Sequence, residues 1–85
     1  MKRSDIPTLA VLEAADKAHT ERRMMTWEYI SEKTGAPKKV IYAAMEREDD
    51  NGYLEWGVSL RTSWLTDEGE AKLRELRRNW KESEI

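Results

Sequence analysis

Apolar residues recur at intervals of three and four along several short segments of this chain, which is the spacing of α-helices. The first such segment covers residues 6–19, where Val11 and Ala15 fall within an arc of about 120° on a helical wheel. Ile6 and Leu9 fall on the polar side of that wheel. They are therefore expected either in an exposed first turn or in contact with another surface. The pattern predicts an amphipathic helix over residues 6–19.

Two further helices are predicted, separated by a tight turn. Thr26 is expected to be the N-cap of the first, over residues 27–34, and Gly35 is expected to end it in a left-handed conformation. The second is expected over residues 37–48, because proline suits a first helical turn and the sequence at 49–52, Asp-Asp-Asn-Gly, is a strong turn signal.

After this turn signal the chain becomes β-prone. Short aromatic segments at 53–56 and 62–65 predict a two-stranded hairpin. Thr66 is expected to cap a final helix, whose acidic first turn is favoured by the helix dipole. The order of elements predicts an α+β fold, mostly helical, as a single domain over residues 1–85.

The final helix carries a narrow apolar stripe. Leu73, Leu76 and Trp80 fall within about 60° of one another, which is typical of a seam against one partner helix. We therefore expect these residues, with Leu9 and Ile6 as further candidates, to form a homodimer interface.

Composition excludes several classes of site. The chain has 85 residues, one His and no Cys, so it has no disulfide framework, no thiolate zinc site and no His pair for a metal. No nucleophile–base constellation is present, and we expect neither an enzyme nor a bound cofactor. No apolar run approaches the roughly 20 residues that cross a bilayer, and no signal peptide is visible. We expect a cytoplasmic protein without a membrane partner.

Charge is unevenly distributed although the net charge is only −2. Residues 36–45 contain two lysines and no acid, and the run at 46–50, Glu-Arg-Glu-Asp-Asp, follows at once. The acidic run does not fit a calcium-loop template. It is interpreted as a region that repels phosphate or as a docking surface for a protein partner.

The third predicted helix turns its cationic side outward. On the wheel, Lys39 lies about 100° and Tyr42 about 40° from Lys38, while Ile41 and Met45 fall on the inner arc. Together with the preceding helix and Gly-containing turn, this is the pattern of a helix-turn-helix. Lysines at the start of such a helix can neutralise phosphates or reach guanine edges, and a tyrosine hydroxyl can donate to either.

Two short motifs in order carry a family resemblance. Gly52-Tyr53-Leu54, then the hairpin, then Leu65-Thr66-Asp67-Glu68-Gly69, resemble the winged helix-turn-helix of MarR-like and PadR-like transcription factors. The resemblance implies a three-helix core, a two-stranded β-wing, a C-terminal helix, double-stranded DNA as ligand and a symmetric dimer. Glu48 departs from it, since the family has an apolar residue at that inward position.

The resemblance assigns the recognition-helix face to Lys38, Lys39 and Tyr42, and the wing tip to Arg61 and Thr62. The function expected is sequence-specific binding of double-stranded DNA by a small transcriptional regulator. The alternative is a winged-helix module that binds a protein rather than DNA, through the acidic 46–50 region and the aromatic wing.

Overall fold

The computed structural model describes residues 1–21, 23–57 and 63–84, without the side chains of residues 80–84. Within these residues the chain forms a short 3-10 helix, four α-helices and a two-stranded antiparallel sheet, so the fold is α+β and mostly helical. This element order is compatible with a winged-helix arrangement. The elements are η1 (Arg3–Asp5), α1 (Thr8–Glu21), α2 (Thr26–Thr34), α3 (Lys38–Asp50), β1 (Leu54–Trp56), β2 (Ser63–Leu65) and α4 (Asp67–Glu84).

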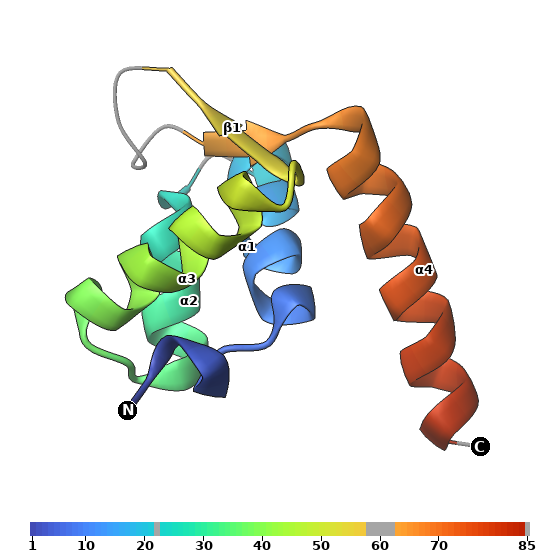
Figure 1. Ribbon diagram of the computed structural model, residues 1–85, viewed down its shortest axis with the longest axis horizontal. Coiled ribbons are helices and arrows are strands. Elements are labelled where there is room, and N and C mark those ends of the chain that lie inside the picture. The colour runs from blue at the N-terminus through green and yellow to red at the C-terminus, as the bar shows by residue number, and fades with distance from the viewer. Residues whose placement is uncertain (22, 58–62, 85) are drawn as a thin grey trace.

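The core lies between α1, α2 and α3 and is closed by the sheet. In Figure 1, α3 crosses in front of α2, the hairpin lies over one end of these helices, and α4 runs down the opposite side of the molecule. The largest fully buried apolar side chains come from the N-terminal segment, the first three α-helices and β1: Ile6, Leu12, Ile30, Ile41, Met45 and Leu54.

The sheet pairs Leu54 with Leu65 and Trp56 with Ser63, which confirms the predicted hairpin. Its first strand begins at Leu54, one residue later than expected. The side chain of Leu54 points into the core. Ser63 faces the same way, and its hydroxyl donates a 3.0 Å hydrogen bond to the hydroxyl of Thr26. The hairpin is therefore attached to the start of α2 by a buried polar contact as well as by apolar packing.

The two sequence motifs at 52–54 and 65–69 lie against each other. The Thr66 hydroxyl donates to the Gly52 carbonyl at 2.6 Å and accepts from the Gly69 N–H at 2.9 Å. The Thr66 N–H also donates to the Tyr53 carbonyl at 3.1 Å. Thr66 thus caps α4, as predicted, and at the same time fastens the start of α4 to the segment that follows α3.

Ile6 lies outside the first helix, which begins two residues later than predicted. The helix begins at Thr8, and Ile6 is in an extended conformation before it, with φ −103° and ψ 105°. Its side chain is fully buried in the core. Because Ile6 is outside the helix, its predicted place on the polar face was wrong, and its burial leaves no surface for a dimer partner.

The predicted N-cap of α2 was also wrong by one residue. Thr26 is the first helical residue, and Met25 precedes it with an extended backbone. The Glu28 carboxylate accepts a 3.0 Å hydrogen bond from the Met25 N–H. A side chain inside the first turn of α2 thus provides the acceptor for the backbone N–H of the residue before the helix. The Thr26 hydroxyl is consequently free to turn inward to Ser63.

Candidate functional site

The turn between α2 and α3 fixes where α3 begins. Gly35 has φ +71° and its N–H donates to the Ser31 carbonyl at 2.8 Å, which ends α2 in the predicted left-handed conformation. The Thr34 hydroxyl donates to the Ile30 carbonyl at 2.7 Å and accepts from the Ala36 N–H at 3.2 Å. These bonds order each residue of the turn, so α3 starts from a defined position.

The inner side of α3 is anchored as the sequence predicted. Ile41, Ala44 and Met45 are buried in the core, and Val40 is half-buried against it. Their burial leaves the opposite side, which begins with Lys38 and Lys39, at the surface. Pro37 precedes the first turn with φ −63°, the angle to which its ring restricts it.

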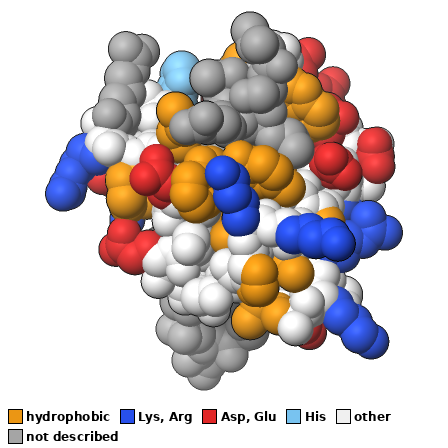
Figure 2. Space-filling view, turned by 90° about the vertical axis from the view of Figure 1, so that its left-hand side faces the viewer, with side chains coloured by type: hydrophobic (Ala, Val, Ile, Leu, Met, Phe, Trp, Pro, Cys, Tyr) orange, Lys and Arg blue, Asp and Glu red, His pale blue; other side chains and the backbone are white. Residues whose placement is uncertain are grey.

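Both lysines are exposed, and neither forms an ion pair with a carboxylate among the described residues. The Lys38 ammonium lies 4.6 Å from the ring centre of Trp27 and 5.5 Å from that of Tyr42. The face seen along α3 from its start carries Lys and Arg side chains with hydrophobic ones between them, and Asp and Glu lie toward its edges (Figure 2). This end of α3 therefore carries two positive charges that no ion pair among the described residues neutralises.

Tyr42 presents its ring rather than its hydroxyl. The hydroxyl oxygen is buried and has no hydrogen-bond partner in the described part of the chain, and the residue as a whole is half-buried. The predicted donation from this hydroxyl to DNA would require the side chain to turn. Its ring instead lies beneath the Lys38 ammonium.

Trp27 is the residue near this face that the sequence did not single out. It lies in the first turn of α2, half-buried, with its indole N–H enclosed. A tryptophan in so small a domain is expected in the core or at an interface, because such a domain needs large apolar groups. Only the crossing of α2 and α3 brings it to Lys38, and periodicity within one helix carries no signal of that.

The acidic run is less acidic at its surface than its sequence indicates. Glu48 is fully buried, and its carboxylate accepts two hydrogen bonds from the Arg47 guanidinium, at 2.7 and 3.0 Å. Arg47 also donates to the carbonyls of Arg3 and Ile6, at 2.8 and 2.7 Å, which ties the N-terminal segment to α3. The inward position of Glu48 is thus confirmed, and its charge is used inside the fold.

The remaining predicted site residues belong to the wing tip and to the dimer interface. Arg61 and Thr62, and the side chain of Trp80, lie outside the described residues. Leu73 is only 3% exposed and belongs to the core of its own chain, while Leu76 is half-buried against that core. Leu73 therefore offers little surface to a second copy, and the dimer interface stays a prediction that rests on the outer part of α4.

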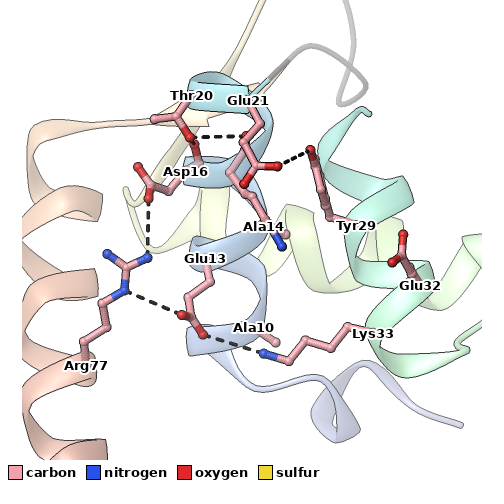
Figure 3. A pocket seen from close by; sticks show the side chains of 11 residues that line it. Ala10, Glu13, Ala14, Asp16, Thr20, Glu21, Tyr29, Glu32, Lys33 and Arg77 are labelled. Carbon is pink, nitrogen blue, oxygen red and sulfur yellow. Dashed lines mark hydrogen bonds and ion pairs between the residues drawn. The ribbon is translucent and has the colours of Figure 1, made fainter. Parts of the chain in front are cut away.

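A shallow pocket of about 570 Å³ lies between α1, α2 and α4, away from α3 (Figure 3). Its floor is low because Ala10 and Ala14 are small. Ion pairs cross it, from Lys33 to Glu13 at 3.7 Å and from Arg77 to Glu13 at 3.6 Å. Arg77 also reaches Asp16 at 3.4 Å. These charges are paired with one another: Arg77 links α4 to α1, and Lys33 links α2 to α1.

No group of His, Asp or Glu side chains among the described residues could hold a metal ion. In the same part of the chain, no helix combines the length and the apolar character that crossing a membrane requires. The chain matches no model of a known protein family, no curated protein and no solved structure.

Proposed function

We propose that this chain binds double-stranded DNA as a winged helix-turn-helix, with α3 as the recognition helix. The observation that carries the proposal is the pair of adjacent, exposed lysines at the start of α3, unpaired with any carboxylate of the described residues. They stand on a helix whose opposite side is fixed in the core by Ile41 and Met45.

Three physical effects act together at this helix start. The major groove of B-DNA is about 12 Å wide and admits an α-helix, and the N-terminal residues of a recognition helix approach the base edges. The first turn also carries about half a positive charge from the helix dipole. Lys38 and Lys39 add two full charges there, and each phosphate they neutralise releases condensed counterions.

The hairpin gives the proposal a second contact. β1 follows α3 closely, and β2 is fastened to α2 through Ser63, so the two strands form a fixed base. Arg61 and Thr62 lie between these strands in the sequence, and their contact with the DNA backbone or minor groove is part of the proposal. A homodimer through the outer part of α4, at Leu76 and Trp80, would present two such modules to two half-sites.

The test is a fluorescence-anisotropy titration with a short labelled duplex of random sequence, at about 50 and 200 mM salt. The variant Lys38→Gln/Lys39→Gln is compared with the control Lys17→Gln/Lys33→Gln, which removes the same charge from the pocket side of the molecule. The slope of the logarithm of the association constant against log salt is negative. We expect the first variant to reduce its magnitude by about 1.8, and the control to reduce it far less. Equal losses in the two variants, or wild-type binding that salt does not change, would contradict the proposal.

A protein-binding module is the second candidate, and one observation favours it. Trp64 in β2 is 39% exposed, with its indole N–H bonded to the Glu55 carboxylate at 3.2 Å, so the outer face of the hairpin is partly apolar. Within the acidic run at 46–50, Glu46 and Asp50 are exposed and Asp49 is half-buried. If amide chemical shifts at 38, 39 and 42 stay constant during the DNA titration, this second function is favoured.

A further inference from the structure

We infer that Trp27 is a positioning residue, which holds Lys38 on an aromatic platform so that its ammonium is a fixed phosphate contact. The platform consists of the Trp27 ring from α2 and the Tyr42 ring from α3. This inference rests on the proposed DNA binding. It gives the two lysines different roles, a fixed phosphate contact for Lys38 and an adaptable contact for Lys39, which nothing in the sequence indicates.

The geometry of Lys38 carries the inference. Its ammonium lies within 6 Å of two ring centres, at 4.6 Å from Trp27 and 5.5 Å from Tyr42, which is the range of a cation–π contact. Tyr42 lies one helical turn after Lys38, so α3 places that ring under the lysine by itself. Trp27 comes from another helix, and it fixes the direction in which the lysine bends.

The platform rings are held in place from below. Both side chains are half-buried and pack against the core, and the polar atom of each, the indole nitrogen and the phenol oxygen, is buried. The ring of each, and not its polar atom, is therefore what faces the Lys38 ammonium. Tryptophan is the aromatic residue that attracts a cation most strongly, and the shorter of the two distances is to Trp27.

A lysine held this way still has donors to spare. An ammonium carries three N–H groups and acts as a compact point charge, so the side that faces the rings leaves the other side for a phosphate oxygen. A free lysine loses the freedom of its flexible stem when it contacts DNA, whereas one already ordered loses less. No such ring contact is recorded for Lys39 among the described residues, which leaves that side chain free to adapt to base edges.

The inference predicts whether the removal of Trp27 weakens or strengthens DNA binding. If the ammonium stays on the rings when DNA binds, then removing Trp27 weakens binding because the ordering has to be completed on the DNA. If the ammonium has to leave the rings, then removing Trp27 strengthens binding. A cation–π contact at an exposed site corresponds to about a two- to fivefold change in an equilibrium constant.

The experiment is a double-mutant cycle on the dissociation constant for the same random-sequence duplex, with wild type, Trp27→Leu, Lys38→Gln and the double variant. We expect Trp27→Leu to weaken binding about two- to fivefold, and to do so only when Lys38 is present. Trp27→Phe, which keeps a ring, should fall between wild type and Trp27→Leu. Lys38→Gln should lower the salt slope by about 0.9.

A matched control exists on the other side of the molecule. Lys17 lies 5.4 Å from the ring centre of Tyr29 and lines the pocket between α1 and α2, so Lys17→Gln removes a lysine in a similar contact away from α3. It should leave the affinity close to that of wild type. Urea unfolding of each variant, followed by circular dichroism, shows that the compared proteins are folded.

A readout without DNA separates the two proposals. The ring currents of Trp27 should shift the ε-methylene proton resonances of Lys38 upfield, and Trp27→Leu should return them toward the values of an exposed lysine. If wild type does not bind duplex, the proposed function fails and the role of Lys38 fails with it. If wild type binds and Lys38→Gln weakens binding, but Trp27→Leu leaves it unchanged or strengthens it, then only the platform is refuted. Unshifted Lys38 resonances in wild type would refute the platform as well.

Discussion

Replacing Gly69 by alanine tests the contact on which the attachment of α4 depends. Gly69 lies in the first turn of α4, directly against the backbone of Tyr53. An added Cβ would lie 2.9 Å from the Tyr53 carbonyl carbon and 3.2 Å from its Cα, and closer still to its oxygen. These are backbone atoms, so no side-chain rotation relieves the overlap, and α4 or the segment at 52–54 has to move.

Two opposing effects set the magnitude. Alanine is the better helix former by about 1 kcal/mol, which alone would stabilise α4. Overpacking of a fixed contact costs about 1–3 kcal/mol. The displacement also stretches the hydrogen bonds of Thr66 to Gly52 at 2.6 Å and to Tyr53 at 3.1 Å, and each such bond contributes about 1 kcal/mol. The steric and hydrogen-bond losses exceed the propensity gain, and we expect a net destabilisation of about 1–3 kcal/mol.

Urea unfolding followed by tryptophan fluorescence measures this difference, and in a domain of this size each kcal/mol lowers Tm by about 4–8 °C. Ala71→Gly, at an exposed position of the same helix, gives the propensity effect without a contact, and should cost about 1 kcal/mol. If Gly69→Ala raised stability by about the amount that Ala71→Gly lowers it, the close approach of α4 to Tyr53 would be refuted.

Two further predictions concern buried polar contacts. Arg47→Ala should lower the free energy of unfolding by about 2–4 kcal/mol, because it leaves the buried Glu48 carboxylate with the Asn51 amide alone, at 3.0 Å. Arg47→Met/Glu48→Leu should regain in urea unfolding the part of that loss that comes from the unpaired carboxylate, although the hydrogen bonds to the carbonyls of Arg3 and Ile6 stay broken. A double variant as unstable as Arg47→Ala would show that the charge pair is not the cause. Ser63→Ala should cost about 1 kcal/mol by leaving the buried Thr26 hydroxyl without its donor. Thr26→Val/Ser63→Ala, which removes both hydroxyls, should melt close to wild type, and additive losses would speak against the hydrogen bond.

The elements could be predicted from the sequence because their ends are set by local chemistry. Gly35 and Pro37 mark the turn between α2 and α3, and the observed helices, Thr26–Thr34 and Lys38–Asp50, differ from the predicted ones by at most two residues. The hairpin and the cap at Thr66 were likewise readable from β-propensity and capping preferences. The buried side of α3 could be predicted because it depends only on the helical periodicity of that one segment.

The contacts between elements could not be predicted in the same way. Arg47 reaches carbonyls more than 40 residues earlier in the chain, and the Thr26 hydroxyl meets Ser63 from the hairpin. Trp27 meets Lys38 only because α2 and α3 cross. A helical wheel places residues on one helix and has no information on how two helices are oriented to each other. For this reason it identified Lys38 and Lys39 but missed the residue that we propose positions one of them.

The order of charges along α3 gives the proposed DNA complex a direction. Glu46 and Asp50 lie at the surface about 10 to 18 Å along the helix axis from the two lysines, at 1.5 Å per residue. The Debye length at physiological salt is about 8 Å, so salt screens the attraction between these acids and the lysines. The net charge of the whole chain therefore says little about the electrostatic potential at the start of α3. A helix lying lengthwise in the groove would nevertheless bring Glu46 and Asp50 toward phosphates. Approach with the N-terminal end first avoids that repulsion, because the lysines meet the DNA while the acidic end of α3 is directed away from it.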